Sequence, residues 1–380
     1  MARLLNKLAS VKLTVILLFI LAVLVVWGTL YQAENGLFEA QQRFYRSHVF
    51  FVWGFIPFPG TQLVLALLFF NLLSSLFVNT RYELKHVGSV LTHLGLLILL
   101  GGGFLVGLHA MEASLTLQEG EGSNLASSYH QWEMAFWDPG DDAAPDAFGR
   151  QTRRVTAVDT DSLRPGQAID FGNLGFAMEV ESYHRNADPH RHGHDEGNSS
   201  PPPLNASGYE SVGPQPAEKE PGRNLPGGVF SVKTGQGDPQ RILLFGGDSG
   251  PTRFDVGDKV LVGSLRRARL PLPFTVALKD FRRDMHPGSS MARSFTSDVV
   301  VMVEETSRPV HIAMNEPLRY RGFTLFQSSY REVPDGREYS TFAVVRNHGR
   351  LLPYVASLVI FVGLTIHFMV VVYQKRPRGT

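Results

Sequence analysis

Four long apolar stretches constrain what this chain can fold into. Residues 13–30, 61–78, 88–108 and 351–373 contain no Asp, Glu, Lys or Arg. A helix needs about 20 predominantly apolar residues to cross the hydrocarbon core of a bilayer, and each stretch has roughly that length. The sequence therefore predicts a membrane protein with four transmembrane helices.

Basic residues flank these spans on one side of the membrane. They precede the first span, separate the second from the third and follow the fourth: Arg3, Lys7, Lys12, Arg81, Lys85, Lys375, Arg376 and Arg378. The positive-inside rule then predicts that both termini are cytoplasmic. The first apolar stretch is longer than the roughly 7–15 residues of the apolar region of a signal peptide, so we expect it to be retained as a span.

The long segment between the third and fourth spans has a different pattern. Residues 111–349 contain short β-branched and aromatic runs separated by turn residues, for example residues 133–137, 175–182, 228–233, 274–281, 299–304 and 322–328. This spacing is typical of an all-β sandwich or barrel. We therefore predict a membrane region over residues 1–110, a large extracytoplasmic all-β domain over 111–349, and a fourth span with a cytoplasmic tail over 350–380.

One part of the β-rich segment departs from this pattern. Residues 184–224 are rich in Pro, Gly, Asn and Ser, which predicts a flexible insertion because such a composition buries little apolar surface. The insertion carries four histidines that a metal ion could use, but a polar loop explains them better. We assign no metal site to His184, His190, His192 and His194.

Composition and motifs exclude several classes of function. The net charge is +1, so the chain lacks the basic excess of a nucleic-acid-binding protein. It has no cysteine, which excludes disulfides and Cys-x-x-Cys redox chemistry within the chain. Phosphate-binding loops, nucleophile elbows and His-Glu-x-x-His zinc motifs are all missing from the sequence.

Histidines are the ionisable residues of the spans. With about 1.5 Å of rise per residue, His93 in the third span and His367 in the fourth lie at similar depths, about 7–9 Å from the cytoplasmic ends of their spans. His109 and His348 lie at the opposite ends of the same spans. The sequence thus offers two levels of histidine pairs, about 24–28 Å apart along the helices.

Two explanations fit these pairs. Two neutral imidazoles from two helices are the axial ligands of many haem irons, and an ionisable residue within a membrane is a functional candidate. Glycines at position 95 and positions 101–103 would admit a flat macrocycle or another helix. Alternatively, the histidines only form hydrogen bonds between helices. The haem-binding candidates are His93 first, then His367, His348 and His109.

Several segments resemble one known family. The start LASVKLTVILLFILAVLVVWGTL, the third span with THLGLLILLGGGFL, and the late segments FTVALKDFRRDM, SFTSDVVVMVEE and IAMNEPLRYRGFTLFQSSY are similar to ResB/CcsB proteins of system II cytochrome c biogenesis. The last span also begins as in that family. One departure is Asn347-His348-Gly349, where the family commonly has Asp-Pro-Gly.

The resemblance implies a function. The protein would lie in the inner membrane with its large domain in the periplasm. It would carry haem b outward and support the attachment of haem to apocytochrome c. It would be at most one subunit of a haem lyase. The partner would be a CcsA-like membrane protein, which supplies a tryptophan-rich motif that this chain lacks. The resemblance also implies that the second haem ligand comes from this partner more readily than from His367. Of the family's sites, His93 is carried over as the histidine of the third span.

An alternative function belongs to a different class. The chain would then be a membrane-anchored β-domain that binds a partner protein without a cofactor. The run LRYRGFTLFQSSYR has the aromatic and arginine content of an interface. The same run also fits the core and outer face of one β-hairpin, which is the interpretation we favour.

Overall fold

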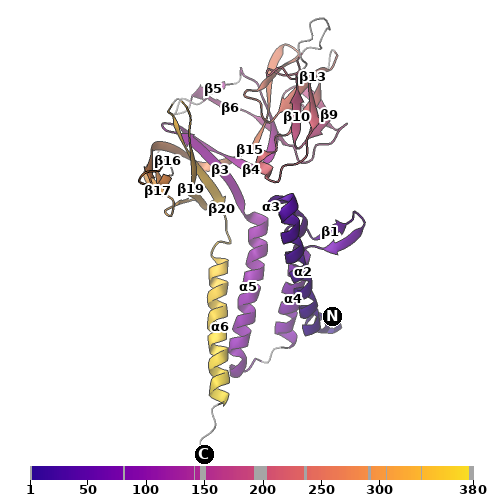
Figure 1. The fold of residues 1–380 in the computed structure, drawn as a ribbon, viewed down its shortest axis with the longest axis vertical. Coiled ribbons are helices and arrows are strands. Elements are labelled where there is room, and N and C mark those ends of the chain that lie inside the picture. Colours follow the sequence, from indigo (N-terminus) through magenta and orange to yellow (C-terminus); the bar gives the residue numbers. More distant parts are fainter. Residues whose placement is uncertain are drawn as a thin grey trace, which may run out of the picture. The chain divides into compact units, whose positions relative to one another are not determined.

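A computed structural model of the chain describes most of its 380 residues. The described residues are 2–79, 82–140, 142–145, 151–191, 203–234, 238–289, 292–304, 306–334 and 336–375. The chain divides into two compact units, one formed by residues 1–111 and 346–380 and the other by residues 112–345 (Figure 1).

The first unit is mainly helical. Its elements are α1 (Ala2–Leu8), α2 (Val11–Asn35), α3 (Leu37–Ala40), the π-helical turn η1 (Gln41–Tyr45), β1 (Val49–Val52), β2 (Ile56–Pro59), α4 (Thr61–Val78), the 3₁₀ turn η2 (Leu84–His86), α5 (Val87–His109) and α6 (Leu352–Lys375). Helices α2, α4, α5 and α6 are long and apolar enough to cross a membrane. A helix suits this environment because all of its backbone groups bond within one segment.

A buried asparagine of α4 stabilises the break between α1 and α2. Asn71 is 2% exposed, and its side-chain amide donates hydrogen bonds to the carbonyl oxygens of Leu8, at 2.5 Å, and Ser10, at 3.1 Å. The hydroxyl of Thr14 donates to Asn71 Oδ1 at 2.7 Å. These bonds satisfy carbonyl groups that the helix break leaves without partners in the helix.

The connection between α2 and α4 folds into an aromatic cluster. The ring of Trp27 lies 5.4 Å from that of Phe44, 5.7 Å from that of Phe50 and 5.8 Å from that of Phe58. Phe44 in η1 is fully buried, while Phe50 and Phe58 belong to the antiparallel hairpin β1–β2. The hairpin is therefore packed against α2, and it ends two residues before α4 begins.

The second unit consists of β-strands and turns. A ten-stranded sheet contains β3, β4, β7 and β14–β20, a four-stranded sheet has the order β13-β12-β9-β8, and β10–β11 and β5–β6 form separate pairs. The strands are β3 (Met111–Gln118), β4 (Gly122–Trp137), β5 (Asp142–Pro145), β6 (Gln151–Arg153), β7 (Thr156–Asp159), β8 (Ala168–Phe171), β9 (Phe176–His184), β10 (Ala187–His190), β11 (Ser211–Pro214), β12 (Gly227–Lys233), β13 (Gln240–Phe245), β14 (Thr252–Val256), β15 (Lys259–Met285), β16 (Ala292–Val303), β17 (Thr306–Ala313), β18 (Leu318–Tyr320), β19 (Phe323–Glu332) and β20 (Glu338–Arg346).

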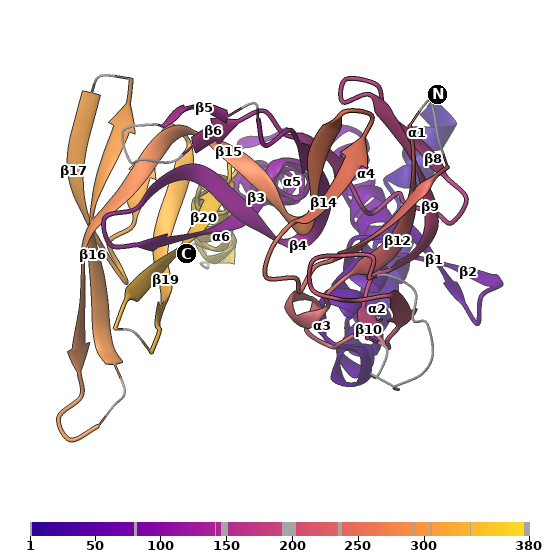
Figure 2. The same ribbon diagram turned by 90° about the horizontal axis from the view of Figure 1, so that it is seen from above.

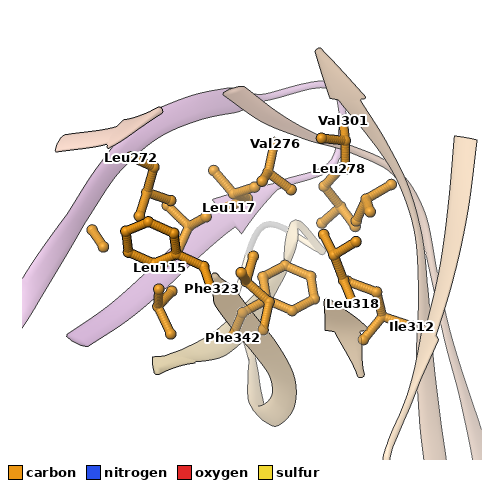
Figure 3. Close-up of a cluster of buried hydrophobic side chains, with 14 of the residues drawn as sticks. Leu115, Leu117, Leu272, Val276, Leu278, Val301, Ile312, Leu318, Phe323 and Phe342 are labelled. Carbon is orange, nitrogen blue, oxygen red and sulfur yellow. The ribbon is translucent and has the colours of Figure 1, made fainter. Parts of the chain in front are cut away.

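The two largest hydrophobic cores of this unit both contain residues of the long strands β4 and β15 (Figure 2). In the first core, Leu115, Leu117, Leu272 and Phe323 point toward one another around Phe342 (Figure 3). The second core is dominated by phenylalanines: Phe136, Phe171, Phe176, Phe230 and Phe254. Strand β15 supplies both because it is 27 residues long, and the residues that it buries change from odd to even positions across the register shift between Arg267 and Arg269.

These observations confirm the predicted fold class, a membrane protein with four apolar helices and a large all-β domain. Each of the six runs that predicted strands lies within a strand or extends one residue beyond it. The hairpin prediction for residues 318–331 is also confirmed, since β18 pairs with β19. Leu318, Phe323 and Leu325 of this hairpin are buried in the first core, so they are not free for a partner.

The prediction of a flexible insertion over residues 184–224 is wrong for the parts that the structure describes. Strands β10 and β11 pair, and Ala187 joins a small core with residues of β12 and β13. Leu204, Tyr209 and Val212 pack against this core, so these few apolar side chains are enough to fold the segment onto the sheet. His192 and His194 lie outside the described residues.

Candidate functional site

Glycines spaced seven residues apart bring α5 against α6. An ideal Cβ at Gly88 would lie 2.6 Å from the carbonyl oxygen of Gly363, and one at Gly95 would lie 2.6 Å from Cγ1 of Ile360. At Gly102 the Cβ would lie 2.9 Å from Leu352 Cβ. Seven residues are close to two helical turns, so these glycines form one stripe along α5. Only glycine permits this approach of the two helices.

His93 lies on the other side of α5. It follows Gly88 by five residues and precedes Gly95 by two, which places it about 140–160° around the helix from the glycine stripe. Its side chain is half-buried within an apolar span. His93 therefore faces away from α6.

The ring of His93 has a defined hydrogen bond. Its Nδ1 lies 2.7 Å from the carbonyl oxygen of Ser89, one turn earlier, and a carbonyl can only accept, so Nδ1 carries the proton. The neutral ring then has its lone pair on Nε2. Metal-binding histidines typically have this arrangement, in which one nitrogen donates to a backbone carbonyl and the other is the ligand. The same hydrogen bond would also satisfy the polar ring of a histidine that binds no metal.

The structure does not bring His367 to His93. The ideal Cβ of Gly88 would lie 2.7 Å from Cα of His367, so His367 is level with Gly88. His93 lies five residues further along α5, or about 7.5 Å. The two histidines therefore differ in depth as well as in the direction they face, and they do not form the facing pair expected from the sequence.

The other two histidines lie at the opposite end of these helices. His109 ends α5, and its Nδ1 lies 3.2 Å from the carbonyl oxygen of Leu105. His348 comes directly before Gly349, whose ideal Cβ would lie 2.6 Å from Cγ2 of Val106 in the last turn of α5. Both histidines are exposed, so they share one end of the α5–α6 pair at its surface.

Helix α5 has a free face around Gly103 and Gly107, away from the glycine stripe. Among the described residues, no side chain and no neighbouring segment comes within 4 Å of an ideal Cβ at Gly103 or Gly107, in contrast to the glycine stripe. At 100° per residue these two glycines lie about 40–80° from His93 around the helix. The seam with α6 has no space for a flat macrocycle, and Gly103 and Gly107 lie about 15 and 21 Å beyond His93 along α5.

The charged groups near the start of α5 are paired with each other. Lys85 Nζ lies 2.6 Å from a carboxylate oxygen of Glu83, and hydrogen bonding to Lys85 lowers the pKa of Glu83. The negative charge of Glu83 therefore offsets part of the attraction that Lys85 would have for the propionates of a haem. Arg81 lies outside the described residues. Among the residues that are described, no group of three or more His, Asp or Glu side chains could hold a metal ion.

Two features of the site are visible in the sequence only once the fold is known. The seven-residue spacing of Gly88, Gly95 and Gly102 is a signal for close helix packing, but it does not say which helix is the partner. Ser89 lies one turn before His93, and its carbonyl orients the ring through a backbone group that any residue would supply.

Comparison with known proteins supports the resemblance to one family. The sequence model of the ResB-like family matches residues 240–338. Protein NrfI of Wolinella succinogenes is 34% identical over 103 residues, which are 25% of this chain and 10% of NrfI. The matched segment thus spans about a tenth of that relative's length. The resemblance to the ResB-like family that the sequence indicated is confirmed.

Proposed function

We propose that this chain is the membrane subunit of a system II cytochrome c synthetase that handles haem b and supports its attachment to apocytochrome c. The observation that carries the proposal is His93, a half-buried histidine in an apolar span whose Nδ1–H donates to the Ser89 carbonyl and whose Nε2 is available as a ligand. The family match over residues 240–338 adds independent support from the β-rich unit.

In this proposal haem is the cargo of the protein, and His93 is one of its axial ligands. The Ser89 carbonyl holds the imidazole in the tautomer that exposes Nε2. With Nδ1–H donating to that carbonyl, the lone pair on Nε2 is the one that an iron would take.

The second axial ligand would come from another chain. His367 lies level with Gly88 on the seam with α6, and the glycine stripe closes that seam. The free face of α5, with His93, Gly103 and Gly107, would instead meet a CcsA-like membrane protein. A haem held between the two chains would have one ligand from each, in keeping with the resemblance to system II proteins.

His109 and His348 would act later in the same process. The positive-inside rule puts their end of α5 and α6 on the periplasmic side, where apocytochrome c would receive the haem. Both are exposed at one end of the helix pair, so a haem arriving there would have two imidazoles within the same chain. The haem would be attached to cysteines of the apocytochrome, and this chain contributes no thiol.

The absorption spectrum of the purified protein tests this function. The chain is expressed in a haem-replete host, alone and together with a CcsA-like partner, and the Soret band is recorded. We expect a band that is lost in His93→Gly and restored when imidazole is added, because free imidazole replaces the missing ligand. His86→Gly is the matched control, since His86 precedes His93 by two helical turns and should leave the band unchanged.

The alternative, a membrane-anchored β-domain that binds a protein partner without a cofactor, rests on a specific observation. The hydrogen bond from His93 to Ser89 satisfies the imidazole without any ligand. Under this alternative the protein is colourless with and without the partner, and His93→Gly changes only its stability. A colourless complex in a haem-replete host would therefore rule out the proposed haem-handling function.

A further inference from the structure

The hairpin β1–β2 has two apolar faces. Residues 49–59 read VFFVWGFIPFP and contain no charged residue. Phe50, on the inward face, is 6% exposed and packs against Trp27. On the outward face and at the turn, Phe51 is 56%, Trp53 80% and Phe55 70% exposed. An antiparallel hairpin with one side in water normally has polar residues on that side, so water is not the natural environment of this face.

The contacts of the hairpin place it at the end of two spans. Trp27, which Phe50 and Phe58 contact, lies three residues before the end of the apolar stretch 13–30. Strand β2 ends at Pro59, two residues before α4 begins. Figure 1 shows the hairpin projecting sideways from this part of the helical unit. Its base therefore lies at the level where α2 and α4 leave the hydrocarbon core.

The backbone of the hairpin limits how deep it can lie. A pair of strands has two edges with unpaired N–H and C=O groups, which are too costly to expose to hydrocarbon. Aromatic side chains with nearby basic groups instead suit the headgroup level. Here the guanidinium of Arg43 lies 5.1 Å from the ring centre of Tyr31 and donates to the carbonyl oxygen of Phe51 at 3.1 Å. Arg46, three residues further along the chain, is exposed.

The turn holds its aromatic residue in an unusual conformation. Trp53 has a φ of 52° and Gly54 a φ of 83°. A positive φ is uncommon for a residue other than glycine, and most of all for a bulky one. A tryptophan kept in this conformation while its side chain is exposed indicates that the exposed ring has a use.

We propose that the outward face of β1–β2 is a membrane anchor that inserts the side chains of Phe51, Trp53 and Phe55 into the headgroup region of one leaflet. The occupant of this face is the lipid interface, because the face continues the apolar surfaces of α2 and α4 at their common end. The anchor would fix the depth of α2 and α4 in the bilayer. It requires no haem and no partner protein, and so is independent of the proposed haem function.

Quenching of tryptophan fluorescence by brominated lipids tests the anchor. The full chain is reconstituted into lipid nanodiscs, and the Trp53 signal is obtained as the difference between the wild type and Trp53→Phe. We expect this signal to fall by about twofold in lipids brominated near the carbonyl end of the acyl chain and by less in lipids brominated near its methyl end, because an aromatic residue at headgroup level lies closer to shallow bromines.

A matched control uses a tryptophan of the β-rich unit. Trp132 is 9% exposed, so the difference signal between the wild type and Trp132→Phe should not change with either lipid. Trp53→Phe keeps an aromatic residue at an exposed position, and its far-ultraviolet circular dichroism should match that of the wild type. Iodide quenching of Trp53 without quenching by any brominated lipid would place the ring in water and overturn the anchor. Stronger quenching by the deep bromines would overturn its interfacial position.

Discussion

A glycine-to-alanine comparison within α5 tests how the helices pack. Gly95→Ala should destabilise the helical unit, whereas Gly103→Ala should stabilise it. The new methyl group at position 95 would lie 2.6 Å from Ile360 Cγ1 and 3.0 Å from the carbonyl oxygen of Ala356. At position 103 there is no atom within 4 Å. Both positions are inside the same helix, so they differ chiefly in what the methyl group meets.

The size of the difference follows from these distances. Alanine favours a helix over glycine by about 1 kcal/mol, a gain that both variants share. Overpacking typically costs about 1–3 kcal/mol, and only Gly95→Ala incurs it. To restore ordinary contacts, α6 must move away by roughly 0.5–1 Å, and a gap of this size loses a quarter to a half of the dispersion energy of the contacts. We therefore expect the two variants to differ by about 1–3 kcal/mol in the free energy of unfolding.

The assay is reversible unfolding in mixed detergent micelles, titrated with sodium dodecyl sulfate and followed by circular dichroism. Gly363→Ala is a second test from the opposite helix, since its methyl group would lie 2.6 Å from the backbone nitrogen of Thr92. It should lower the free energy of unfolding as Gly95→Ala does. If Gly95→Ala and Gly103→Ala change this free energy equally, α5 and α6 do not pack through the glycine stripe.

Three further predictions concern polar groups. Asn71→Ala should lower the free energy of unfolding by about 1–3 kcal/mol in the same micelle titration, because two partly buried carbonyls at the helix break lose their donor. In the β-rich unit, Gln327→Ala leaves two buried serines without their amide partner. This variant should lower the free energy of unfolding of the full chain in urea by about 1–3 kcal/mol. Gln327→Leu fills the space and should lower it by less. Hydrogen bonding to His311 lowers the pKa of Asp298, so this carboxylate stabilises the fold above its unfolded pKa, and the contribution is lost as the pH falls through the lower folded pKa. Asp298→Asn should therefore flatten the fall in thermal stability below about pH 4.

The period and length of the apolar runs were enough to predict the spans and the strands. Long uncharged stretches have no alternative to helices that cross a bilayer, and alternating β-branched runs separated by turns predict an antiparallel β-domain. The segment 184–224 shows where this reasoning fails. Its composition is polar, yet in the described parts, residues 184–191 and 203–224, Ala187 and a few further apolar side chains pack against residues of β12 and β13.

The buried polar network around Gln327 was likewise not predictable from the sequence. Ser297 donates to Gln327 Oε1 at 2.8 Å, and the Gln327 amide donates to Ser340 at 2.8 Å. The three residues come from β16, β19 and β20 and are at most 6% exposed. In the sequence Gln327 belongs to a run with the character of an interface. Strand β16 is not a neighbour of β19 or β20 in the sheet, so only the packing of the folded sheet shows that Gln327 satisfies two buried hydroxyls.

The sequence by itself determined that this chain crosses a membrane, that it has a large β-domain and that His93 lies within an apolar span. Depth along a helix follows from counting residues, because the rise per residue is constant. The direction in which a side chain faces depends on which neighbour packs against which side of the helix. The glycine stripe turns His93 away from α6 and brings Gly88, rather than His93, level with His367. Tertiary packing alone therefore decided that these two histidines do not face each other, because it sets the rotation and stagger of each helix.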